Sequence, residues 1–189
     1  MPTRILVFAA CLATVAMQVA TVRACGYDAP QSIQLGTLNW AYPDALYVHS
    51  AVADAEAVGL IPHEPAADDG LSPLQHATAM MKEFGAKLFD QRQAGRHATI
   101  AVVLIPQVMW TRFTIDPAGI SMQQHVDGPS EHDLVIVTDE KVIHTLLDGK
   151  LGADTAESRG LIRYYGDADG IAEVRTALTK EPRQVLLRD

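Results

Sequence analysis

Cys25, His49 and His63 are the residues whose types offer the most distinctive chemistry in this sequence. A thiolate and two imidazoles suit a soft metal such as copper, so these three residues could form a metal site. In the alternative, Cys25 is a free thiol near a flexible start of the chain. His125 and His132 could meet across a turn, but no closely spaced ligand pair accompanies them. The sequence therefore favours no metal site and keeps Cys25, His49 and His63 as the alternative.

The residue patterns of common catalytic sites do not occur in this sequence. It contains no serine in a G-x-S-x-G turn and no cysteine and histidine paired on ordered elements. Asp68 with Asp69, and Asp167 with Asp169, are acids of loops, where carboxylates are typically solvated or cap a helix. The sequence therefore predicts a protein that is not an enzyme and that needs no cofactor.

The first 24 residues have the composition of a signal peptide. Arg4 precedes an apolar run over residues 5–22, and residues 22–24 (VRA) place small side chains at the two positions that a signal peptidase reads. This pattern predicts that residues 1–24 are removed and that the mature protein is exported, to a periplasm or as a secreted protein. No other segment is apolar over a length that spans a bilayer.

Cleavage would make Cys25 the first residue and the only cysteine of the mature protein. No intramolecular disulfide could then form, so the fold must rest on its hydrophobic core. Residues 24–26 (ACG) also resemble the end of a lipobox, which would make the protein a lipoprotein with a membrane tether at Cys25. The free thiol is the alternative.

The charge balance is acidic. The sequence has 15 Lys and Arg against 23 Asp and Glu, a formal net charge of −8, and loss of Arg4 and Arg23 makes it more negative. Nucleic acids and anionic membrane surfaces attract cationic patches, so this balance argues against both as partners. Composition identifies no protein partner.

The chain after the signal divides into two parts. Residues 25–70 are predicted to be an N-terminal helical segment, with a turn-rich stretch to Asn39, a helix over residues 43–58, and an acidic, proline-containing loop over residues 61–70. Residues 71–189 are predicted to form the main domain.

The main domain has a regular order of expected elements. A helix opens at Ser72 and Pro73, with an apolar stripe at Leu74, Ala77, Met81, Phe84, Leu88 and Phe89. Two strands lie within residues 98–116, a third begins at Ile120, and a fourth covers residues 134–137. A helix capped by Thr138 or Asp139 follows over residues 139–147, and a capping-box-like pair, Asp154 and Glu157, opens a short helix. The last elements are a strand over residues 161–165 and a helix over residues 171–178.

Two stretches carry a resemblance to a known family. Residues 146–151 (LLDGKL) and 160–167 (GLIRYYGD) resemble the glycine-containing turns of the sterol carrier protein 2 (SCP2-like) family, and the order of elements is similar over roughly residues 72–178. The resemblance implies an α+β fold, in which helices back a mostly antiparallel sheet around an apolar tunnel. Two features depart from the family: the export signal, and residues 109–113, which only loosely echo its tryptophan-containing hairpin.

The resemblance also implies a function. The protein is expected to bind a lipid or other nonpolar small molecule in an apolar cavity. In the alternative, the same apolar stripes fill a solid core, and the protein is an interaction module that binds a partner through its N-terminal segment. The residues expected to bind the ligand are Trp110, Phe113, Leu146, Leu147, Ile162, Tyr164, Ile171 and Val174.

Overall fold

The computed structural model describes residues 31–63, 73–90, 98–117 and 119–179. The predicted signal peptide, Cys25 and most of the predicted acidic loop lie outside the described residues.

Five strands form one mixed sheet in the order β3-β2-β1-β4-β5. β1 and β4 are parallel, and the other three neighbouring pairs are antiparallel. This confirms the predicted α+β fold with a mostly antiparallel sheet. The strands are β1 (Ala98–Leu104), β2 (Met109–Asp116), β3 (Gly119–Gln124), β4 (Leu134–Thr138) and β5 (Arg163–Tyr165).

The central strands are buried on both faces of the sheet. In β1, Ile100, Val102 and Leu104 point to one face and Ala101 and Val103 to the other, and all five are at most 1% exposed. A strand covered on both sides needs apolar residues at every position, which explains the continuous run AVVL at residues 101–104.

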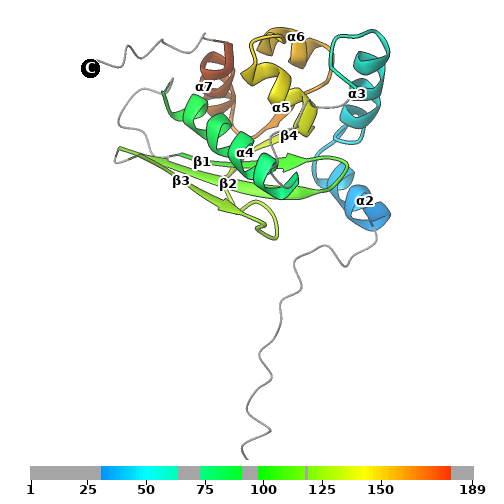
Figure 1. Ribbon diagram of the computed structural model, residues 1–189. Helices are drawn as coiled ribbons and strands as arrows, with labels where there is room; N and C mark the ends of the chain where they lie inside the picture. Colours follow the sequence, from blue (N-terminus) through cyan, green and yellow to red (C-terminus); the bar gives the residue numbers. More distant parts are fainter. Residues whose placement is uncertain (1–30, 64–72, 91–97, 118, 180–189) are drawn as a thin grey trace, which may run out of the picture.

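Helices cover the face that carries Ile100 and Val102, here called the helix-covered face. Figure 1 shows α4 (Pro73–Asp90), α5 (Glu140–Leu147) and α7 (Ala168–Thr179) above this face, with α6 (Ala153–Ser158) beyond α5. α4 contacts β2, β3, α5 and α7. Its Gly85 approaches the sheet so closely that a Cβ atom there would lie 2.6 Å from Cε1 of Phe113, the β2 residue paired with Ile100.

The helix signals in the main domain were mostly correct. Of the predicted α4 stripe, Ala77, Met81, Phe84 and Leu88 are buried, whereas Phe89 is 38% exposed. The Asp139 side chain caps α5 by accepting a hydrogen bond from Lys141 N at 2.8 Å. The predicted capping box of α6 was wrong, because its N-cap is Gly152, which has no side chain to form a cap.

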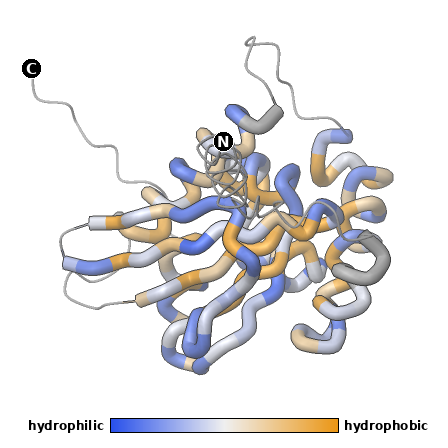
Figure 2. The backbone as a smooth tube through the Cα atoms, turned by 90° about the horizontal axis from the view of Figure 1, so that it is seen from below, coloured by the Kyte–Doolittle hydropathy of each residue, from blue (hydrophilic) through white to orange (hydrophobic). Residues whose placement is uncertain are grey.

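Within residues 31–63, the part of the N-terminal segment that the structure describes, lie two helices, α2 (Gln31–Ala41) and α3 (Tyr47–Ala57), which confirms the helical extension. The turn-rich prediction was wrong over residues 31–39, which are helical. The second helix does not begin at Pro43, because Asp44 has φ +68°, a left-handed conformation that interrupts the helix. Figure 2 shows the sheet from the face opposite α4, α5 and α7, with its strands in front.

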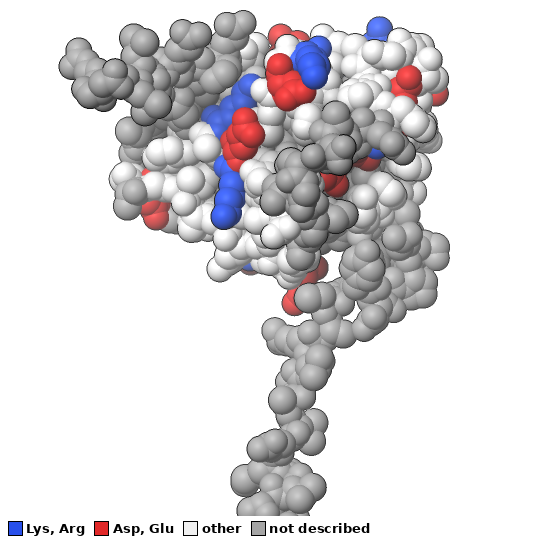
Figure 3. Space-filling view, in the orientation of Figure 1, with Lys and Arg blue, Asp and Glu red and all other residues white. Residues whose placement is uncertain are grey.

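None of the helices in the described ranges is long and apolar enough to cross a membrane. On the side of the molecule in Figure 3, basic side chains lie next to acidic ones within a largely uncharged surface.

Candidate ligand-binding site

The structure separates one of the eight predicted ligand-binding residues from the others. Trp110 pairs with Val103 and therefore lies on the sheet face opposite the helices. There its ring packs against Tyr42 of the N-terminal segment, with ring centroids 6.0 Å apart. Phe113 lies three residues later on β2 and so points to the helix-covered face. The alternation of side chains along a strand already implied this separation.

The other seven residues belong to the helix-covered side of the core. Phe113 lies on β2, Leu146 and Leu147 on α5, Ile162 directly before β5, Tyr164 on β5, and Ile171 and Val174 on α7. Phe113, Leu146, Ile162 and Val174 are at most 2% exposed, whereas Leu147, Tyr164 and Ile171 are half-buried and pack against the same cluster. These residues come together because the helices and the sheet share one apolar layer.

Sequence reasoning missed the sheet residues of this layer. Ile100, Val102 and Leu104 of β1 and Ile136 of β4 face the helices and are at most 1% exposed. The signal that could have identified them is the alternation of side chains along β1. Once Phe113 is assigned to the helix-covered face, its partner Ile100 and every second residue after it belong to the same face. The candidate site is therefore the layer between these strands and α4, α5 and α7.

Three polar atoms in this layer are buried without a hydrogen-bond partner among the residues that the structure describes. They are Oγ1 of Thr111, Nε2 of Gln124 and the hydroxyl of Tyr164. Buried polar groups in proteins almost always have a partner, and each exception requires an explanation such as a bound molecule or water. No local sequence pattern indicates these atoms, because their environment depends on strand register.

Tyr164 lies beside Arg175 of α7. Burial raises its pKa well above the ordinary value for tyrosine, so its hydroxyl keeps its proton at any physiological pH. The guanidinium of Arg175 lies 5.6 Å from the centroid of the Tyr164 ring and is held by Glu157 at 2.8 Å. The Tyr164 hydroxyl is therefore a neutral group that can donate one hydrogen bond into the layer.

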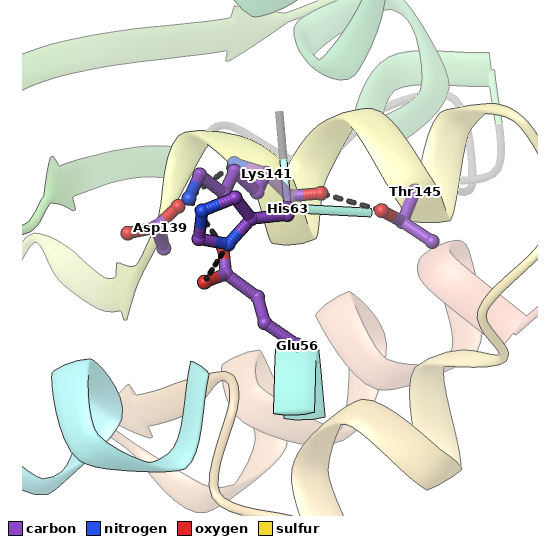
Figure 4. A network of polar contacts seen from close by, with 5 residues as sticks. All are labelled: Glu56, His63, Asp139, Lys141 and Thr145. Carbon is purple, nitrogen blue, oxygen red and sulfur yellow. Dashed lines mark hydrogen bonds and ion pairs between the residues drawn. The ribbon is translucent and has the colours of Figure 1, made fainter. Parts of the chain in front are cut away.

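A second polar cluster joins α3 to the start of α5 (Figure 4). Lys141 Nζ donates to Glu56 Oε1, and His63 Nδ1 lies 3.3 Å from Glu56 Oε2. The hydrogen bond from Lys141 lowers the pKa of Glu56, whereas burial raises the pKa of Asp139, which is 6% exposed. These groups pair with each other or cap a helix, and so they fasten the N-terminal segment to the main domain.

The described residues contain no group of three His, Cys, Asp or Glu side chains that could hold a metal ion. His49 lies on α3 and His63 near the end of the N-terminal segment, where it pairs with Glu56. Cys25, the third residue of the alternative metal site, is outside the described residues.

The aromatic residues of the N-terminal segment are divided between the core and the surface. Tyr42 packs against Trp110 and also against Tyr165, with ring centroids 5.1 Å apart in the second pair. The Tyr165 hydroxyl donates to Pro43 O at 2.7 Å. Trp40, by contrast, is 91% exposed and Tyr47 is 63% exposed.

The chain was compared with known families, curated proteins and solved structures. No family model matches it. No curated protein matches it either. Solved structures do match. Several of them carry sterol carrier protein 2 or SCP2 in their names. This is the family that the sequence motifs resemble.

Three of these structures illustrate the range of the matches. A crystal structure of sterol carrier protein 2 is 18% identical, with a TM-score of 0.40, over 53% of this chain and 88% of that chain. Palmitated SCP2L2 from Aedes aegypti is 14% identical, with a TM-score of 0.41, over 58% of this chain and 96% of that chain. A stereoselective inverting sec-alkylsulfatase from Pseudomonas sp. is 14% identical, with a TM-score of 0.38, over 52% of this chain but only 14% of the enzyme.

Proposed function

We propose that this protein is an exported, non-enzymatic binding protein for a lipid or other nonpolar small molecule. The ligand would lie in the apolar layer between the sheet and α4, α5 and α7. The protein would act in a periplasm or outside the cell, either free or tethered through a lipid on Cys25.

The observation that carries the proposal is the composition of this layer. Its walls are apolar, yet Thr111, Gln124 and Tyr164 each place an unpartnered polar atom in it. Leaving a buried donor or acceptor unsatisfied costs about 1–3 kcal/mol, so a solid core would gain stability from apolar residues at these positions. A bound molecule with both apolar and polar parts accounts for both properties. The sequence resemblance favours the same function.

Native mass spectrometry of gently purified protein tests the proposal. We expect a mass equal to the chain from Cys25 onward plus one small apolar molecule, and a diacylglyceryl adduct if Cys25 is lipidated. An uncleaved chain recovered from the cytosol would contradict export. A chain with no adduct, which also fails to bind the hydrocarbon fluorophore diphenylhexatriene, would contradict ligand binding.

Two valines of β1 provide a matched pair of variants. Val102 faces the helices and Val103 faces the other side of the sheet, where its partner Trp110 packs against Tyr42, and neither valine is exposed. In a solid core, an added phenyl ring costs roughly 1–3 kcal/mol at either position. In a carrier, Val102→Phe occupies ligand space, so it should abolish binding of diphenylhexatriene with little loss of stability. Val103→Phe should destabilise the protein and leave the affinity of its folded fraction unchanged.

Binding of a protein partner is the second candidate function, because Trp40 and Tyr47 are largely exposed. Exposed aromatic side chains are frequent at protein interfaces. In native mass spectrometry of the purified protein, a co-purifying protein chain in place of a small molecule would favour this candidate. Equal destabilisation by Val102→Phe and Val103→Phe would support it further.

A further inference from the structure

The three unpartnered polar atoms of the helix-covered face belong to residues in one row across the sheet. Gln124 is paired with Thr111, Thr111 with Val102, Val102 with Ile136, and Ile136 with Tyr164. The row therefore has two polar side chains at one end, two apolar ones in the middle and a tyrosine at the other end. Neighbouring strands are about 4.8 Å apart, so Thr111 and Tyr164 are separated by roughly 14 Å.

The polar end at Thr111 and Gln124 presents hydrogen-bond donors. Thr78 of α4 donates its hydroxyl to Oε1 of Gln124 at 3.1 Å, which leaves the amide nitrogen of Gln124 with its N–H groups free to donate. The hydroxyl of Thr111, a residue with no exposed surface, has one proton to donate. Directly paired residues of antiparallel strands have their Cβ atoms about 5 Å apart, so both donors can reach one acceptor oxygen.

The charges around this end favour a neutral acceptor. Among the described residues, no Lys, Arg or His side chain is bonded to Thr111 or Gln124. Arg112, the basic residue next to Thr111, points to the opposite face, where it binds Asp133 at 2.8 Å and the Gly128 carbonyl at 2.8 Å. A buried carboxylate without a cation is strongly unfavourable, whereas a carbonyl oxygen needs only the two donors.

We infer that the site takes an uncharged lipid with a carbonyl oxygen, as in an ester, ketone or quinone. The oxygen accepts hydrogen bonds from Thr111 and Gln124, and the apolar part of the molecule lies along Val102 and Ile136 toward Tyr164. This inference rests on the proposed function, because it names the ligand class of that same layer.

Three probes that differ in their head group test the inference. Diphenylhexatriene has no polar group, methyl oleate has an ester carbonyl, and oleate has a carboxylate on the same chain. Binding of diphenylhexatriene is measured by fluorescence, and the other two are measured by its displacement. We expect methyl oleate to displace the probe at a concentration at least about fivefold lower than oleate, because oleate must bury its charged carboxylate without a cation, whereas the ester is neutral.

Thr111→Val removes the hydroxyl and keeps the shape of the side chain. We expect about fivefold weaker binding of methyl oleate, unchanged binding of diphenylhexatriene, and no loss of thermal stability. Thr114→Val is the matched control, because Thr114 lies on the same strand and faces the other side of the sheet. It should leave the affinities for both ligands unchanged.

The outcomes separate this inference from the proposed function. If diphenylhexatriene binds but oleate competes as well as methyl oleate, the carrier function stands and the neutral-carbonyl inference is wrong. The inference is also wrong if Thr111→Val lowers stability and weakens both ligands equally, because the hydroxyl would then be bonded to buried water or protein. If no probe binds, both the proposed function and this inference are wrong.

Discussion

Replacing Gly85 with alanine should destabilise the protein, whereas the same replacement at Gly36 should stabilise it. Both glycines lie inside helices, α4 and α2. A Cβ atom at Gly36 would meet nothing within 4 Å. At Gly85 it would lie 2.6 Å and 2.9 Å from two carbons of the Phe113 ring and 3.2 Å from Cδ1 of Ile120.

The magnitudes follow from two opposing effects. Alanine is more favourable than glycine in a helix interior by about 1 kcal/mol, and this gain applies at both positions. Overpacking a core costs roughly 1–3 kcal/mol, and this cost applies only at Gly85. The free energies of unfolding of the two variants should therefore differ by about 1–3 kcal/mol, with Gly36→Ala the more stable.

Urea denaturation of both variants, checked by thermal unfolding, measures this difference. For a chain of this size, 1 kcal/mol corresponds to about 2–4 °C in Tm. Combining Gly85→Ala with Phe113→Leu should recover part of the loss, because the smaller side chain makes room for the methyl group. If Gly85→Ala stabilises the protein as much as Gly36→Ala does, α4 does not pack directly on Phe113, and the described helix-sheet layer is wrong.

Two further predictions concern the polar cluster between α3 and α5, and urea denaturation across pH 3 to pH 7 measures both. Lys141 lowers the pKa of Glu56, so Glu56 stabilises the fold above about pH 4.3 and loses this effect as the pH falls. Glu56→Gln should therefore cost up to about 1 kcal/mol at pH 7 and less as the pH falls toward 3, and an equal cost at both would refute the pairing. Burial raises the pKa of Asp139, so its ionised form weakens the fold as the pH rises. Asp139→Asn should gain stability relative to the unmodified protein between pH 4 and pH 7, whereas Asp139→Ala should lose about 1 kcal/mol with the helix cap.

Much of the fold could be predicted from local signals in the sequence. The break of the 98–116 stretch at Pro106, the Asp139 cap and the apolar stripe of α4 each depend on residues close together in the chain. These signals failed where tertiary contacts decide the outcome. Asp44 adopts φ +68° between α2 and α3, and this conformation delays the start of α3 to Tyr47.

The candidate site was only partly predictable. The apolar residues of α5, β5 and α7 were identified by their periodicity, but Trp110 was grouped with Phe113 although the two point to opposite faces. The row from Gln124 to Tyr164 depends on the register of four strand pairs, which no local pattern specifies. The contact between Glu56 and Lys141 joins residues 85 positions apart. A glutamate and a lysine can each pair with many other residues, so their types alone do not predict this contact.

The aromatic contacts behind the sheet have a consequence for how a ligand could enter. Tyr42 packs on Trp110 and Tyr165, and the Tyr165 hydroxyl holds the Pro43 carbonyl, so the N-terminal segment supports the sheet from behind. A sheet packed on both faces resists bending, because any movement would separate close-packed side chains on one side. Entry and exit of a lipid would therefore require α4, α5 or α7 to move away from the sheet while the sheet itself stays fixed. The segment would thus act as a rigid backing, so that ligand exchange depends on movement of the helices.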